Sequence, residues 1–76
     1  MDLQILHLNY NEITSIPDSI SNLQNLLYLW LQYNKIINIP DSIGNLHNLQ
    51  ELWLHGNKIT NIPDFIPVNI KNKIKL

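Results

Sequence analysis

The chain has 76 residues, which is enough for one small domain. Its net charge is −1 and it contains no Arg, so the composition favours neither nucleic acid nor an anionic membrane surface as a partner. It also contains no Cys, which excludes disulfides, thiolate zinc sites and thiol catalysis.

A short strand is predicted near the N-terminus, because Leu6 and Leu8 alternate with outward positions on either side. The same alternation recurs at residues 28–32 and 51–55. The sequence therefore predicts short parallel strands that stack about 4.8 Å apart.

An Asn follows each predicted strand, at Asn11, Asn34 and Asn57. Asn readily turns the chain and hydrogen-bonds the backbone with its side chain. We expect these side chains to satisfy backbone groups of the adjoining turns. A functional Asn triad is the less favoured alternative.

The motif Ile-Pro-Asp-Ser-Ile recurs at residues 16–20 and 39–43 and predicts a short helix or 3₁₀ turn on the opposite side. We expect Pro at the first helical position and side-chain caps from Asp18 and Asp41, with Ser19 and Ser42 as further capping candidates. Catalysis by these Asp-Ser pairs is much less favoured.

The pattern changes after residue 66, where Pro67 follows at once and Asn69 replaces an expected Leu. Ile74 and Leu76 restore the apolar spacing, one residue earlier than a 23-residue step would place it. Either a shorter repeat begins a fourth strand here or the array ends in a degenerate copy, and both alternatives stay open.

These elements form an internal repeat of 23 residues. Across copies 3–25, 26–48 and 49–71, 26 of 27 fixed positions agree, and residues 72–76 form a degenerate or partial fourth copy. A period in the twenties indicates a solenoid, so we predict a single domain over residues 1–76.

The repeated pattern Leu-x-x-Leu-x-Leu-x-x-Asn-x-Ile-x-x-Ile-Pro-x-x-Ile-x-x-Leu-x-x resembles the leucine-rich repeat. Its 23-residue length resembles the intracellular class found in Ras-interacting scaffolds and plant cytosolic relatives. The resemblance implies an α/β solenoid, with short parallel strands on a concave face and short helical or 3₁₀ turns on a convex face. It also implies a non-enzymatic binding module in signal transduction, and it names no partner.

Aromatic residues at equivalent outward positions mark the candidate site. Trp30 and Trp53 lie on adjacent predicted strands, and Tyr28 shares the face of Trp30. Exposed aromatic patches usually mark interaction sites, although stacked rings also stabilise a sheet. We therefore predict that a protein or peptide binds seven outward residues: His7, Tyr28, Trp30, Gln32, Glu51, Trp53 and His55.

No catalytic, metal or cofactor site is predicted. His7 and His55 lie two strands apart, whereas zinc ligands must lie about 2 Å from one ion. The Ser residues lie outside the strand face, and no Gly-rich loop could cradle phosphate. We expect no enzyme activity, no nucleic acid and no membrane among the partners.

The chain opens directly into a repeat without a secretory leader, so we expect a cytoplasmic protein. Neither end resembles a polar cap, which solenoids usually need. Three explanations stay open: a fragment of a longer array, self-association through the uncapped ends, or a marginally stable product. The alternative functions are a substrate-recognition fragment of a larger signalling or ubiquitin-ligase enzyme, and a residual fragment without a partner of its own.

Overall fold

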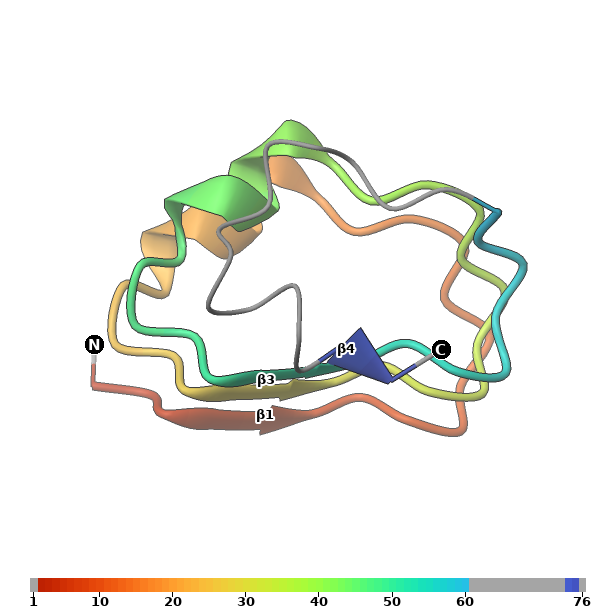
Figure 1. Cartoon of the computed structure of the whole chain (residues 1–76), viewed down its shortest axis with the longest axis horizontal. Coiled ribbons are helices and arrows are strands. Elements are labelled where there is room, and N and C mark those ends of the chain that lie inside the picture. The colour runs from red at the N-terminus through yellow and green to blue at the C-terminus, as the bar shows by residue number, and fades with distance from the viewer. Residues whose placement is uncertain (1, 61–73, 76) are drawn as a thin grey trace.

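The chain coils so that strands lie on one side and 3₁₀ turns on the other (Figure 1). The computed structural model describes residues 2–60 and 74–75. Its elements in chain order are β1 (Ile5–His7), η1 (Asp18–Asn22), β2 (Tyr28–Trp30), η2 (Asp41–Asn45), β3 (Glu51–Trp53) and β4 (Ile74–Lys75). This arrangement confirms the predicted solenoid of parallel strands and 3₁₀ turns.

The strands form one four-stranded parallel sheet in the order β1-β2-β3-β4. Leu6 pairs with Leu29 and Leu29 with Leu52, so each of these steps spans 23 residues. Leu52 pairs with Ile74, so the last step spans 22. Of the two open alternatives, the shorter repeat that begins a fourth strand is the one observed. Pro67 and Asn69 lie outside the described residues, and the domain bounds stay a prediction.

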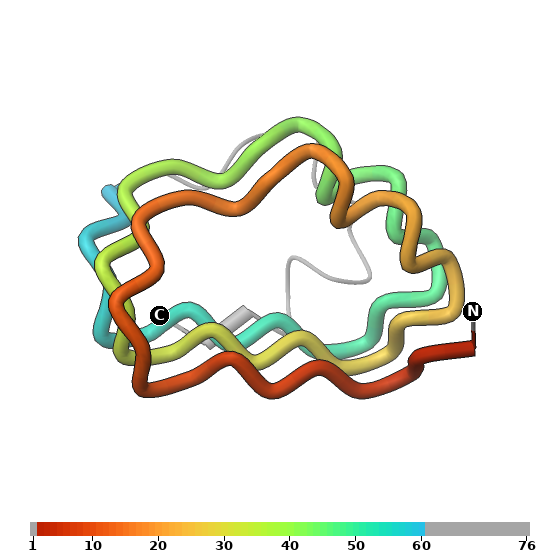
Figure 2. The backbone as a smooth tube through the Cα atoms, turned by 180° about the vertical axis from the view of Figure 1, so that it is seen from behind, coloured from red at the N-terminus to blue at the C-terminus, as the bar shows by residue number. Residues whose placement is uncertain are grey.

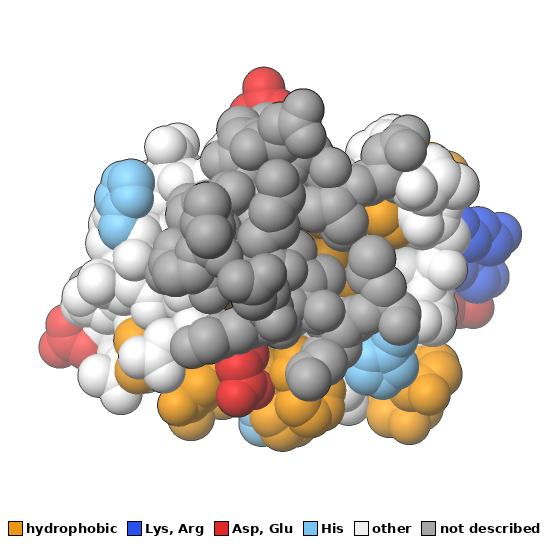
Figure 3. Space-filling view, in the orientation of Figure 1, with side chains coloured by type: hydrophobic (Ala, Val, Ile, Leu, Met, Phe, Trp, Pro, Cys, Tyr) orange, Lys and Arg blue, Asp and Glu red, His pale blue; other side chains and the backbone are white. Residues whose placement is uncertain are grey.

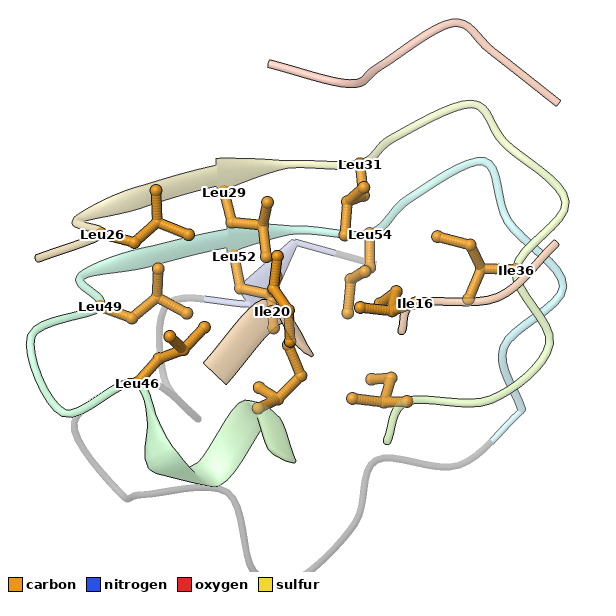
Figure 4. Packing of buried hydrophobic residues seen from close by; sticks show 12 residues of the cluster. Ile16, Ile20, Leu26, Leu29, Leu31, Ile36, Leu46, Leu49, Leu52 and Leu54 are labelled. Carbon is orange, nitrogen blue, oxygen red and sulfur yellow. The ribbon is translucent and has the colours of Figure 1, made fainter. Parts of the chain in front are cut away.

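Leucine and isoleucine at the fixed positions fill the interior between the strands and the turns (Figure 4). The leucines of the second and third repeats stack in pairs, and Leu26, Leu29 and Leu52 are fully buried. Their counterparts in the first repeat, such as Leu6, are only partly buried. Full burial of one such side chain contributes about 1.5–3 kcal/mol to folding.

The repeated Asn residues join neighbouring repeats, as predicted. The Oδ1 of Asn34 accepts a hydrogen bond from the backbone N–H of Ile13 at 3.0 Å. Its Nδ2 donates to the carbonyls of Leu8 at 3.0 Å and Leu31 at 2.9 Å. Asn57 repeats this arrangement one turn later, where it accepts from the N–H of Ile36. Each of these side chains therefore satisfies backbone groups of two turns.

The predicted side-chain caps of the turns were wrong. Pro17 and Pro40 occupy the N-cap position rather than the first helical position, and neither turn has a side-chain cap hydrogen bond. The backbone closes the turn instead, because the N–H of Ile20 donates to the carbonyl of Pro17 at 3.1 Å. Asp18 is thereby left to accept a hydrogen bond from Ser42 Oγ at 3.4 Å, which joins the two turns.

Candidate functional site: the concave face

Parallel pairing places His7, Trp30 and Trp53 side by side across three strands. The rings of His7 and Trp30 stack with centroids 4.1 Å apart and planes 19° apart. The two indoles stack at 4.3 Å with planes only 3° apart. We call these three residues the aromatic row. Because each ring covers the face of its neighbour, the row presents ring edges, rather than ring faces, to anything that lies on the sheet.

The indole N–H groups of the aromatic row are turned away from solvent. The Nε1 atoms of Trp30 and Trp53 are buried and have no hydrogen-bond partner among the described residues. The two indoles as a whole are half-buried, and His7 at the edge strand is exposed. The accessible part of the indoles is therefore carbon, which suits contact with an apolar surface.

A second set of aromatic rings lies just beyond the strands and was not among the predicted site residues. The rings of Tyr10 and Tyr33 stack with centroids 4.7 Å apart, and these side chains are 71% and 46% exposed. The ring of Tyr33 also meets His55 edge-on, at 5.1 Å and 86°. We call Tyr10 and Tyr33 the tyrosine row. Their shared position in the repeat was the sequence signal that could have identified them.

In the third repeat, Gly56 stands at the position equivalent to Tyr10 and Tyr33. Its lack of a side chain affects how the Tyr33 ring lies. Tyr10, Tyr33 and Gly56 all adopt positive φ, at 58°, 61° and 72°. A Cβ on Gly56 would lie 2.5 Å from Cδ1 of Tyr33, which is closer than real Cβ contacts. The missing side chain therefore gives the Tyr33 ring the space in which it lies.

Between the two aromatic rows lie Asn9, Gln32 and His55. Gln32 is only 5% exposed, and its Oε1 has no partner among the described residues. Of the seven predicted contact residues, Gln32 is thus the one that lies beneath the surface. A partner can therefore touch only a small part of it.

On the other flank of the aromatic row, Tyr28 pairs with Glu51 in register, and both are half-buried. Ile5 beside them is 49% exposed. Hydrophobic side chains gather along the edge of the molecule that the sheet forms (Figure 3). Among the residues of β1, β2 and β3, Glu51 is the only charged one on this face.

Within residues 2–60 and 74–75, no group of three or more His, Cys, Asp or Glu could hold a metal ion. In the same part of the chain, no helix is long and apolar enough to cross a bilayer.

Comparison with known proteins supports the architecture. A profile described as Leucine rich repeat matches residues 2–59. The chain belongs to the leucine-rich repeat family. Among solved structures, it is similar to a leucine-rich repeat protein from Leptospira interrogans, with 35% identity and a TM-score of 0.74. That match covers 75% of this chain and 14% of the other. A search of curated proteins found no match.

Leucine-rich repeats generally act as protein-interaction modules and are typically not enzymes. The coarse functional class predicted from the sequence therefore agrees with the family. The 23-residue intracellular class, the cytoplasmic location and the role in signal transduction stay predictions.

Proposed function

We propose that this leucine-rich repeat chain binds a protein or peptide on its concave face, with the aromatic row at the centre. The observation that carries the proposal is the stacking of three rings at equivalent positions, with their edges exposed. No element of the repeat pattern requires an aromatic residue at these positions. Trp is also the residue most enriched among binding hot spots.

The chemistry of the face limits the kind of partner. The ring faces already contact one another, so they offer little stacking area to bases or to cationic groups. On β1 to β3, Glu51 is the only charged residue of the face, and Lys75 of β4 is the register partner of Trp53. An extended segment with apolar side chains, lying across the strands, fits these properties best.

The size of the face limits the affinity. Four strands make a sheet only about 15 Å across, given a strand spacing of about 4.8 Å. A standard protein interface uses roughly 20–30 residues on each side. Taken alone, the face suits a short peptide or a weakly bound protein. No observation favours the enzyme-associated alternative, which stays a prediction.

The test compares the native chain with the double variant Trp30→Ala/Trp53→Ala. Partners are first captured from a lysate, and the affinity of each captured protein is then measured by titration. Because hot-spot truncations cost about 2 kcal/mol or more each, we expect affinity to fall by roughly thirtyfold for each truncation and by roughly a thousandfold for both if their effects add.

The matched control is Ile37→Ala/His47→Ala, which removes two exposed side chains away from the strands. We expect the control to bind as the native chain does. Circular dichroism and thermal melting establish that each variant is folded. Equal affinity of the folded Trp variant and the native chain would rule out the aromatic row as the binding centre.

A further inference from the structure

The strand segments of the first three repeats run side by side along one side of the coil (Figure 2). Residues at the same position in successive repeats therefore form rows across the sheet. Next to the aromatic row lies a second row on the same face, made of Ile5, Tyr28 and Glu51. We call these three residues the flank row. It combines an aliphatic side chain, a phenol ring and a carboxylate, so its chemistry differs from that of the aromatic row.

Glu51 supplies the charge of the flank row. The residue is half-buried, and a carboxylate that is partly removed from water is stabilised by a nearby positive charge. Within residues 2–60 the ion pair that forms joins Lys35 to Glu12 at 3.6 Å, so Glu51 has no ion-pair partner in that part of the chain. On β4, Lys75 is the register partner of Trp53 rather than of Glu51. The flank row thus offers a carboxylate to a cation that approaches the sheet.

Tyr28 places an aromatic ring directly beside this carboxylate. Tyr28 and Glu51 are register partners on β2 and β3, and neighbouring strands lie about 4.8 Å apart. The rings of the aromatic row and of the tyrosine row stack face to face, whereas the Tyr28 ring takes part in no aromatic pair within residues 2–60. The face of an unstacked ring attracts a cation. Tyr28 can therefore add to the attraction of Glu51 for positive charge.

Ile5 extends the flank row with apolar surface, because its side chain is 49% exposed. The stems of Lys and Arg are aliphatic and lie along apolar surface while their charged heads remain at polar groups. A basic side chain that lies across the flank row would place its stem over Tyr28 and Ile5 and its charged head at Glu51. The three residues together fit this shape of ligand.

A metal ion fits the flank row less well than a basic side chain. Calcium and magnesium take several oxygen ligands, whereas Ile5 offers none and Glu51 is the only carboxylate of the row. Nor could any group of three or more His, Cys, Asp or Glu in residues 2–60 and 74–75 hold a metal ion. One carboxylate with apolar neighbours is instead suited to an organic cation.

We propose that the flank row binds one Lys or Arg side chain of the protein or peptide that lies on the concave face. This inference rests on the function proposed above, and it adds a requirement for positive charge to an otherwise apolar partner. The flank row and the aromatic row lie two residues apart on the same strands. A segment that crosses the strands would therefore contact the two rows together.

The test first obtains ligands by panning a phage-displayed library of short random linear peptides against the native chain. We expect the enriched peptides to combine apolar residues with a Lys or Arg. One enriched peptide is then titrated beside an analogue that has Gln in place of the basic residue. The native chain should bind the basic peptide about fivefold more tightly, as expected for a partly exposed ion pair, and added salt should reduce this preference.

Variants of the flank row then assign the preference to its residues. Glu51→Gln should bind the two peptides alike, and Glu51→Lys should prefer the analogue. Tyr28→Leu keeps an apolar side chain without the ring and should reduce the preference in part. The matched control is Glu12→Gln, which also removes one carboxylate but lies outside the strands with its side chain 85% exposed, and it should keep the native preference. Circular dichroism establishes that each variant is folded.

The outcomes separate this inference from the proposed function. Enriched peptides without a basic residue would overturn the inference, and so would an unchanged preference in Glu51→Gln. The concave face would still be the binding site if Trp30→Ala/Trp53→Ala no longer bound those peptides. Peptides that bind this double variant as tightly as the native chain would overturn the proposed function instead. A library from which no peptide is enriched would count against both.

Discussion

The first and second repeats have nearly the same sequence pattern, but their equivalent residues contribute differently to the stability of the fold. Leu29 in the second repeat is fully buried, whereas its equivalent Leu6 is only partly buried. Asn34 joins two repeats through three hydrogen bonds, whereas Asn11 bonds only to carbonyls close to it in the chain. In a solenoid, the stability that a residue contributes depends on whether its repeat has a neighbour on each side, and not on the residue type alone.

The leucines should show the largest difference between the two repeats. Leu29→Ala leaves a cavity between two repeats and should lower the free energy of unfolding by about 2–5 kcal/mol. Leu6→Ala removes a side chain that already borders an open hollow, so the loss should be markedly smaller. Urea denaturation of both variants measures the difference. Equal losses would contradict the difference in burial between Leu6 and Leu29.

The asparagines should show the next largest effect. Asn34→Ala leaves the N–H of Ile13 and two carbonyls without their partner, which should cost about 2–3 kcal/mol. Asn11→Ala is its matched control and should change stability by less than about 1 kcal/mol, since surface substitutions away from special features have small effects. Hydrogen exchange at the Ile13 amide gives a local measurement. Slow exchange of that amide in the Asn34 variant would contradict the bonding described above.

Gly56→Ala extends the comparison to the third repeat and should have the smallest effect. Positive φ costs a residue with a side chain about 1–2 kcal/mol, and the new methyl group would also displace the Tyr33 ring. Gly44→Ala, within η2, is the control, because no positive φ is recorded there. We expect Gly56→Ala to lower Tm by several degrees more than Gly44→Ala. Matching Tm values would show that the Tyr33 ring moves aside without cost.

Much of the fold could be predicted because a strict period relates each residue to its neighbours. The strands, the inward leucines and the bridging role of Asn34 and Asn57 all follow from repeated spacing. The capping role predicted for Asp18 was wrong, because Pro17 is the N-cap residue and backbone hydrogen bonds close the turn. The 22-residue step to β4 did not follow from the period either, because the pattern changes after residue 66.

The candidate site was predicted less completely than the fold. The aromatic row followed from equal positions in the repeat, because parallel strands bring such positions together. The tyrosine row carries the same signal of equal positions, but its stacking depends on left-handed backbone at Tyr10 and Tyr33, which the pattern does not show. The burial of Gln32 could not be anticipated either, because alternation alone predicts an outward side chain there. Alternation places a residue on a face, but its neighbours decide how much of it a partner can touch.

The stacked indoles also allow binding at the sheet to be followed by intrinsic tryptophan fluorescence. Trp30 and Trp53 are the only tryptophans in the sequence, and they lie against each other on one face of the sheet. Almost all of the intrinsic fluorescence excited at the red edge of absorption therefore arises from that face. Anything that settles on the exposed ring edges, or separates the two rings, should change the emission of the whole molecule without any added label.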